Sequence, residues 1–216
     1  MNCNKNNMKI IGLSGGIASG KNAVANIFFE LGIEVFDADA VVHNLYLHDQ
    51  KIIELVAQNF LETFDGKIIN RQILSSIISK NPDQIHVLEK IIHPKIREIY
   101  QNFLEKNLQK KADFVVINIP LLLESNQYKT DKIIAIIADG KTRQDRYIQR
   151  VVADLKNANP DLINQLKNKF LMLKNKQISD AERIKNADFV IQNDGNLADL
   201  KQKTLEIYRE MINNLN

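Results

Sequence analysis

The segment Lys9-Ile-Ile-Gly-Leu-Ser-Gly-Gly-Ile-Ala-Ser-Gly-Lys21 decides the fold predicted for this chain. Its apolar start ends in glycines and is typical of a buried strand. From Asn22 onwards, apolar residues recur at the i, i+3, i+4 and i+7 positions of an amphipathic helix, and Gly32 marks its end. A second apolar run at 33–36 indicates another strand. The segment therefore predicts a βαβ unit in which a glycine-rich loop joins the first strand to the helix.

The rest of the chain alternates between helical and strand-like stretches. Residues 40–111 have helical periodicity, and a break is predicted at His93-Pro94 because proline restricts the residue before it to an extended conformation. Continuous apolar runs at 114–119 and 132–138 are typical of parallel strands covered on both faces, and a short final strand at 189–191 precedes a closing helix. We therefore predict an α/β fold of three layers, with a parallel five-stranded sheet and two helical insertions.

The composition excludes several classes of protein. The chain has 216 residues, of which 44% are hydrophobic and 25% charged, as is ordinary for a globular domain. Cys3 is the only cysteine, so a disulfide framework and a multi-cysteine zinc site are excluded and a reducing compartment is expected. A net charge of +3 and an aromatic content of 6% argue against a nucleic-acid-binding module.

The sequence carries no sign of export or membrane insertion. No apolar run reaches the ~18 residues that would span a membrane, and residues 1–7 are polar, without the apolar core of a signal peptide. We therefore expect a cytoplasmic protein without membrane or nucleic-acid partners, present as a monomer or a weak homo-oligomer. Residues 1–7 are expected to be a disordered extension without a role.

The glycine-rich loop matches the pattern G-x-x-x-x-G-K and lies between a predicted strand and a predicted helix. Glycines let backbone amides turn toward phosphate oxygens, the helix N-terminus adds positive potential, and Lys21 can reach the β- and γ-phosphates of a nucleotide. The alternative is a plain glycine-rich turn with an exposed lysine. A dinucleotide-binding loop is disfavoured because no G-x-G-x-x-G can be drawn here. The expected nucleotide contacts are Gly15, Gly16, Ile17, Ala18, Ser19, Gly20, Lys21, Asn22 and Ala23.

Asn22 departs from the usual pattern of a phosphate loop. The residue after the lysine is normally Ser or Thr, whose hydroxyl binds a magnesium ion. The amide oxygen of Asn is an acceptable ligand for a hard cation, but the side chain is longer and carries a competing NH₂ group. We therefore expect Asn22 to hold Mg²⁺ through water.

Two carboxylates, Asp37 and Asp39, follow the second predicted strand. If the chain is still extended there, both point toward the crevice at the carboxyl end of the strand, where the phosphate loop also opens. Phosphoryl transfer requires a group that orients and deprotonates the acceptor hydroxyl, and we assign this role to Asp39. Asp37 is expected either to hold Mg²⁺ through water or to cap a helix.

Three arginines, Arg143, Arg146 and Arg150, share one side of a predicted helix after the fourth strand because they are three and four residues apart. A row of guanidinium groups could bind phosphate and stabilise charge on a transferring phosphoryl group. The alternative is a basic face that only meets solvent.

Taken together, these motifs resemble those of the dephospho-coenzyme A kinases over nearly the whole chain. The matching stretches are 11–21, 35–39 with His43, 65–67 with Arg71, 92–94, 120–124, Gln177 and 187–195. The resemblance implies a P-loop kinase-like fold. Its implied parts are a nucleotide-binding core (8–39, 112–140 and 186–216), a helical coenzyme A-binding region (40–111) and a helical lid (141–185).

The resemblance implies that the γ-phosphate of ATP, with Mg²⁺, is transferred to the ribose 3′-hydroxyl of dephospho-coenzyme A. The implied catalytic residues are Asp39, Lys21 and Arg146. ATP would also be bound by Arg146, Arg150, Asn193 and Gly195. The implied substrate contacts are Asp39, Arg71, His93, Pro94, Leu122 and Glu124.

Three features depart from the family pattern: Asn22-Ala23 replaces Ser-Thr, Ala18 replaces glycine, and the lid is longer at 151–176. Two other functions therefore remain open. One is a P-loop kinase for a nucleoside or another small molecule, and the other is a nucleotide-binding regulator that has lost catalysis. A GTPase is disfavoured because the chain lacks the guanine-reading tetrapeptide Asn-Lys-x-Asp.

Overall fold

A computed structural model describes residues 8–125, 127–153 and 159–215. The predicted N-terminal extension and part of the longer lid segment lie outside these residues. The chain divides into two compact units: one runs up to Phe36 and resumes at Lys111, and the other is Asp37–Lys110. We call them the sheet unit and the helical unit.

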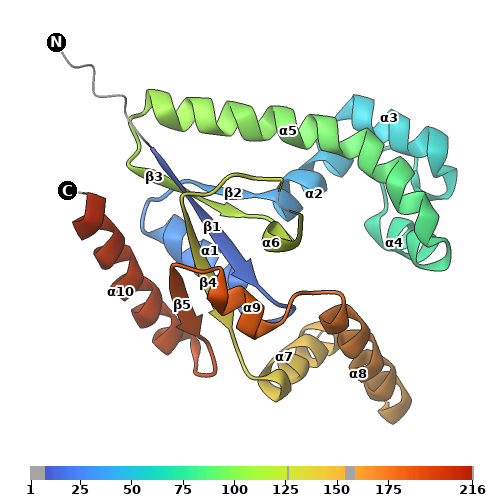
Figure 1. Ribbon diagram of the computed structural model, residues 1–216. Helices are drawn as coiled ribbons and strands as arrows, with labels where there is room; N and C mark the ends of the chain where they lie inside the picture. The colour runs from blue at the N-terminus through green and yellow to red at the C-terminus, as the bar shows by residue number, and fades with distance from the viewer. Residues whose placement is uncertain (1–7, 126, 154–158, 216) are drawn as a thin grey trace. The chain divides into compact units, whose positions relative to one another are not determined.

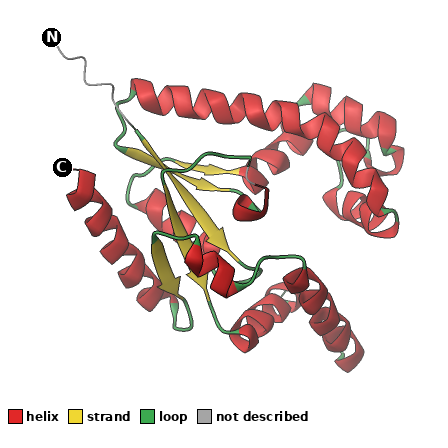
Figure 2. Cartoon of the chain, in the orientation of Figure 1, coloured by secondary structure: helices red, strands yellow, loops and turns green. Residues whose placement is uncertain are grey.

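Parallel strands form the centre of the sheet unit (Figures 1 and 2). The five strands are β1 (Lys9–Gly15), β2 (Val35–Asp37), β3 (Phe114–Asn118), β4 (Lys132–Ile137) and β5 (Phe189–Gln192). Their order is β2-β3-β1-β4-β5, and β1 runs parallel to both of its neighbours, β3 and β4. The predicted α/β fold with a parallel five-stranded sheet is therefore confirmed.

Helices cover both faces of this sheet. Successive residues of β1 point to opposite faces, so both faces carry side chains that pack against helices. Ile11 and Leu13 are buried in a core shared with α1 and α10, whereas a Cβ atom added to Gly12 would lie 2.6 Å from the Cδ2 atom of Leu122 in α6. The helices of the sheet unit are α1 (Lys21–Glu30), α6 (Leu122–Ser125), α7 (Gly140–Val152), α8 (Pro160–Asn175), α9 (Asp180–Lys185) and α10 (Leu197–Leu215). The phosphate loop thus leaves β1 in the middle layer.

The helical unit consists of α2 (Ala38–His48), α3 (Gln50–Asn59), α4 (Arg71–Lys80) and α5 (Ile85–Gln109), with short 3-10 turns at Leu61–Thr63 and Pro82–Gln84. The predicted break at His93-Pro94 is wrong, because Pro94 lies inside the continuous helix α5. Leu88 and Ile92 before it, and Ile96 and Tyr100 after it, form one buried stripe at helical spacing. The packing of this stripe outweighs the ~3 kcal/mol that an interior proline costs a helix.

No helix within the described ranges is both long and apolar enough to cross a membrane.

Candidate phosphate-binding site

The glycine-rich loop joins β1 to α1 in a conformation that few residues adopt. Ala18 and Gly20 both have positive φ angles, 58° and 101°. Gly20 forms the N-cap of α1, and as a glycine it has no side chain that could cap the first turn. The loop therefore leads directly into the positive end of the α1 dipole, as in a phosphate loop.

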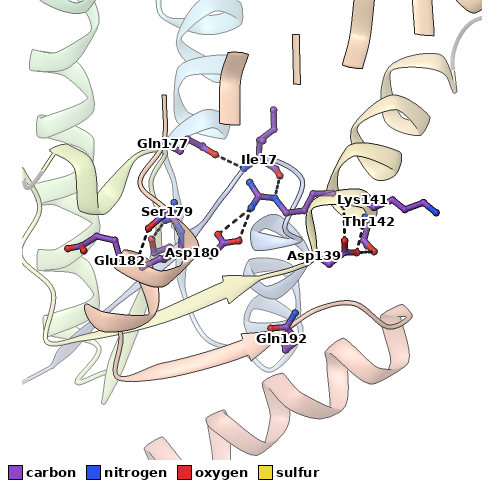
Figure 3. Close-up of polar contacts among 12 residues, drawn as sticks. Ile17, Asp139, Lys141, Thr142, Gln177, Ser179, Asp180, Glu182 and Gln192 are labelled. Carbon is purple, nitrogen blue, oxygen red and sulfur yellow. Dashed lines mark hydrogen bonds and ion pairs between the residues drawn. The ribbon is translucent and has the colours of Figure 1, made fainter. Parts of the chain in front are cut away.

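Three side chains from distant parts of the chain hold the loop. The Oε1 atom of Gln177 accepts a hydrogen bond of 2.8 Å from the backbone N–H of Ile17, as Figure 3 shows. The Nε atom of Arg143 donates to the carbonyl oxygen of Ile17 at 2.9 Å. The Nδ2 atom of Asn193 donates to the carbonyl oxygen of Ser19 at 2.8 Å. Because the N–H of Ile17 already has a partner, Ile17 shapes the loop rather than supplying an open amide.

The side chains that hold the loop also explain two of its glycines. A Cβ atom on Gly16 would collide with the guanidinium group of Arg143, and one on Gly20 would collide with the amide of Asn193. The space around these glycines is therefore filled by the chain's own side chains, in addition to any space that phosphate needs.

The three arginines lie on α7, in accord with the prediction of a shared helix, but they have different partners. Arg143 is 3% exposed and pairs with Asp180, with the Nη1 and Oδ2 atoms 3.1 Å apart. Arg146 donates to the carbonyl oxygens of Asn193 at 2.8 Å and Gly195 at 3.0 Å. Arg150 lies 6.0 Å from the ring centre of Tyr147.

These partners separate the roles of the arginines. Arg143 belongs to the support of the phosphate loop, since its donors reach Ile17 and Asp180. Arg146 lies together with Asn193 and Gly195, so three of the residues predicted to bind the nucleotide form one cluster.

Asn118 is a site residue that the sequence reasoning missed. It is the last residue of β3 and is 2% exposed. Its Oδ1 atom accepts a hydrogen bond from the Nζ atom of Lys21, and its Nδ2 atom donates to the Oδ1 atom of Asn22 at 3.2 Å. The available signal was a polar residue at the carboxyl end of an otherwise apolar strand.

The residues beside Lys21 include a possible ligand for magnesium. Asn22 offers one neutral amide oxygen, which accepts from the Nδ2 atom of Asn118, whereas the oxygen of Asn118 already accepts from the ammonium group of Lys21. Oxygen is the ligand that hard cations prefer. Within the described ranges, no group of three or more His, Cys, Asp or Glu side chains is arranged to hold a metal ion. A single amide oxygen suits a metal held mainly by nucleotide phosphates and water.

Two of the predicted substrate contacts, Leu122 and Glu124, belong to the sheet unit, and both lie in α6. Leu122 is 4% exposed and its side chain packs beside Gly12. The carboxylate of Glu124 pairs with the guanidinium of Arg183 at 3.4 Å and accepts a hydrogen bond of 3.2 Å from the backbone N–H of Ile178. Glu124 is therefore engaged inside the unit.

The prediction that Asp37 and Asp39 share an extended direction is wrong, because α2 already begins at Ala38. Asp37 ends β2 and caps the helix, with its Oδ1 atom accepting a hydrogen bond of 2.9 Å from the N–H of Ala40. A side-chain acceptor at the N-cap satisfies one of the unpaired donors of the first turn. Asp39 lies in that first turn and is exposed.

The other predicted substrate residues lie on two helices of the helical unit. Arg71 is the exposed first residue of α4, and its positive charge acts on the phenol of Tyr46 in α2. Burial raises the pKa of Tyr46 to about 12, and the charge of Arg71 lowers it in part. His93 is half-buried and Pro94 exposed in the middle of α5.

Comparison with known proteins gives a consistent result. The family model for dephospho-CoA kinase matches residues 9–199. A dephospho-CoA kinase from Bartonella henselae is 32% identical over 208 residues, which cover 96% of this chain and 100% of the relative. One from Fusobacterium nucleatum is 36% identical over 202 residues, covering 90% and 94% of the two chains.

A solved structure is similar over the same length. The dephospho-CoA kinase from Campylobacter jejuni has a TM-score of 0.64 at 26% identity, covering 94% of this chain and 96% of that one. The residues matched by the family model, 9–199, include the phosphate loop with the side chain of Gln177 that helps to hold it, as well as Asn118 and the cluster around Arg146. Because the match extends over most of the sequence and includes these residues, the chain belongs to the dephospho-CoA kinase family.

Proposed function

We propose that the chain phosphorylates the ribose 3′-hydroxyl of dephospho-coenzyme A with ATP, giving coenzyme A and ADP. The observation that carries the proposal is the phosphate loop, which leads into the N-terminus of α1 and has Lys21 beside it, in a chain of this kinase family. A phosphate loop held by Gln177, Arg143 and Asn193 needs little rearrangement when nucleotide binds.

In this proposal, ATP lies with its phosphates on the loop from Gly15 to Ala23. Lys21 neutralises charge on the β- and γ-phosphates, and the N-terminus of α1 supplies backbone donors. The cluster of Arg146, Asn193 and Gly195 binds the nucleotide beside the loop. Within the described residues, Arg146 donates to two carbonyl oxygens, and a guanidinium group has five N–H donors, so Arg146 can also donate to charge that develops during phosphoryl transfer.

Mg²⁺ would be held beside the phosphates by Asn22, through water, and the NH₂ group of Asn118 would orient the Asn22 amide. When bound, the ion supplies neutralisation of the charge on the β- and γ-phosphates. Changing Asn22 to Ser is expected to lower the Mg²⁺ concentration needed for half-maximal nucleotide binding, because a hydroxyl can bind the ion directly. The exposed Asn26 of α1, changed to Ser, is the matched control. An unchanged Mg²⁺ requirement in Asn22→Ser would remove the support for this assignment.

Asp39 is the proposed base. It is exposed at the start of α2, directly after β2, and parallel strands of an open sheet bring ligands to their carboxyl ends. Its carboxylate would accept the proton of the 3′-hydroxyl as the oxygen attacks the γ-phosphorus. Asp37 contributes by capping α2 and thereby fixing the turn that carries Asp39.

Dephospho-coenzyme A is an anionic acceptor, and we place it on the helical unit. Arg71 provides a cation at the start of α4, and His93 with Pro94 provides a half-buried surface on α5. Charge-assisted hydrogen bonds from Arg71 to phosphate would fix the acceptor.

The test is the release of ADP by the purified protein with ATP, Mg²⁺ and dephospho-coenzyme A. Asp39→Asn removes the proposed base, and adenosine or pantothenate replaces the acceptor in parallel reactions. We expect turnover only with dephospho-coenzyme A, and a loss of about 10²-fold or more in Asp39→Asn. Binding of ATP without transfer to any acceptor would overturn the proposal and favour a nucleotide-binding regulator.

A further inference from the structure

A buried ion pair next to the phosphate loop has no role in the reaction proposed above. Arg183 of α9 is 2% exposed, and its Nη2 atom lies 3.4 Å from the Oε1 atom of Glu124, a side chain that is 16% exposed. The Nη1 atom of Arg183 donates to the Oγ atom of Ser14. Burial lowers the pKa of Arg183, and the negative charge of Glu124 opposes this effect.

This pair is poorly suited to stabilising the fold. The Nε atom of Arg183 and the Oε2 atom of Glu124 are both buried and have no hydrogen-bond partner among the described residues. When the remaining donors and acceptors of a buried ion pair have no partners, the attraction between the charges seldom offsets the free energy needed to remove them from water. The pair therefore needs an explanation other than stability.

The contacts of Arg183 and Glu124 reach both ends of residues 14–17, the segment that leads from β1 into the phosphate loop. Ser14 lies in β1 directly before the glycines of the loop. Glu124 accepts a hydrogen bond from the N–H of Ile178. The neighbouring Gln177 accepts one from the N–H of Ile17, as Figure 3 shows. Residues 14–17 are thus attached at one end to Arg183 and at the other to the segment that Glu124 holds.

We infer that Arg183 and Glu124 are positioning residues that hold residues 14–17 in the conformation that binds nucleotide. The inference rests on the proposed function, and it changes the role of Glu124 from a contact to the acceptor into a support of the nucleotide site. Without the pair, Ser14 loses a charged partner and the segment at Ile178 loses its anchor, so the loop donors shift away from the phosphates. Nucleotide binding weakens, whereas binding of the acceptor is unaffected.

The experiment measures ATP and ADP binding directly by calorimetry, without acceptor. Arg183→Met is expected to weaken binding by about tenfold or more, since it removes a charge-assisted contact to Ser14. Arg183→Lys keeps the charge and is expected to recover part of the affinity. Lys185→Met is the matched control, because Lys185 is an exposed cation on the same helix.

A double variant separates positioning from stability. Arg183→Met leaves Glu124 buried without its partner and can unfold the protein for that reason alone. Combining it with Glu124→Gln removes both charges, so we expect near wild-type melting but nucleotide binding as weak as in Arg183→Met. If the double variant does not fold, Glu124→Gln alone decides. Glutamine still offers an oxygen to the N–H of Ile178 but lacks the charge that holds Arg183 beside Ser14, so we expect nucleotide binding to weaken about threefold or more.

The outcomes distinguish this inference from the proposed function. Nucleotide binding at wild-type strength in the deciding variant would overturn the inference, as would a raised KM for dephospho-coenzyme A with an unchanged KM for ATP. A wild-type protein that binds ATP but transfers nothing to dephospho-coenzyme A would overturn the proposed function, while binding to the variants would still decide the inference. A wild-type protein that binds no nucleotide would overturn both.

Discussion

Ala18 shows how one residue in the phosphate loop bears a conformational cost. Its φ angle of 58° lies in the left-handed region, where the Cβ atom of an L-residue approaches the following carbonyl oxygen. Glycine at this position would relieve the contact. We expect Ala18→Gly to raise the free energy of unfolding by about 0.5–1 kcal/mol, because relief of strain exceeds the added entropy of the unfolded chain.

Urea denaturation measures this effect, with Ala23→Gly as the control. Ala23 lies within α1, where glycine is expected to lower the free energy of unfolding by up to about 1 kcal/mol. A loss of stability in Ala18→Gly as large as that in Ala23→Gly would contradict the assignment of strain to Ala18.

Tyr46 gives the helical unit a pH dependence. Its pKa is about 12 in the folded chain against an ordinary value of 10.0, because burial disfavours the phenolate. The unfolded chain therefore releases its proton first as the pH rises, and stability that is fully present below pH 10 is lost between about pH 10 and 12. The loss amounts to about 2 to 3 kcal/mol. We expect Tyr46→Phe to flatten this part of the profile in denaturation experiments, and equal slopes in the two proteins would refute the explanation.

At the scale of elements, the start of α2 decides where Asp39 lies. Asp37 caps the helix through the N–H of Ala40, so the chain turns from strand to helix between the two aspartates. Asp37→Ala is expected to cost about 1 kcal/mol of unfolding free energy and to reduce turnover by displacing Asp39.

Asp37→Asn is the informative companion, because asparagine also caps helices but carries no charge. We expect it to retain both stability and turnover in thermal unfolding and ADP-release assays. A strong loss of turnover at limiting Mg²⁺ in a stable Asp37→Asn protein would instead indicate that Asp37 holds the metal.

At the scale of the whole molecule, the phosphate site joins segments that are far apart in the sequence. Gln177 reaches Ile17, and Asn193 reaches Ser19, so the phosphate loop depends on the C-terminal part of the chain. Nucleotide bound to the loop should therefore stabilise the sheet unit as a whole. At 100 times its Kd, ADP is expected to raise the free energy of unfolding by about 2.7 kcal/mol.

Thermal unfolding with and without ADP measures this gain. Lys21→Met should abolish most of it, since the charge that meets the phosphates is removed. Lys167→Met, at an exposed position on α8, should keep it. A full ADP-dependent gain in Lys21→Met would place the nucleotide elsewhere.

Much of the fold follows from local sequence patterns. The βαβ unit was predicted because the apolar runs, the glycines and the helical spacing lie within 9–36, and each pattern has one simple solution. The strands at 114–119 and 132–138 were predicted because a short continuous apolar run is typical of a parallel strand buried on both faces. The prediction of a break at Pro94 was wrong because it used only the local preference of proline, whereas the continuity of α5 depends on the packing of its buried stripe.

The site divides in the same way. Sequence by itself determined the phosphate loop, Lys21 and the family, since these depend on residue types at short, fixed spacings. Only the tertiary structure decided that Arg143 supports the loop, that Asn118 joins Lys21 to Asn22, and that Glu124 pairs with Arg183. These contacts join residues about a hundred or more positions apart, or side chains whose direction depends on packing, and no local pattern records either.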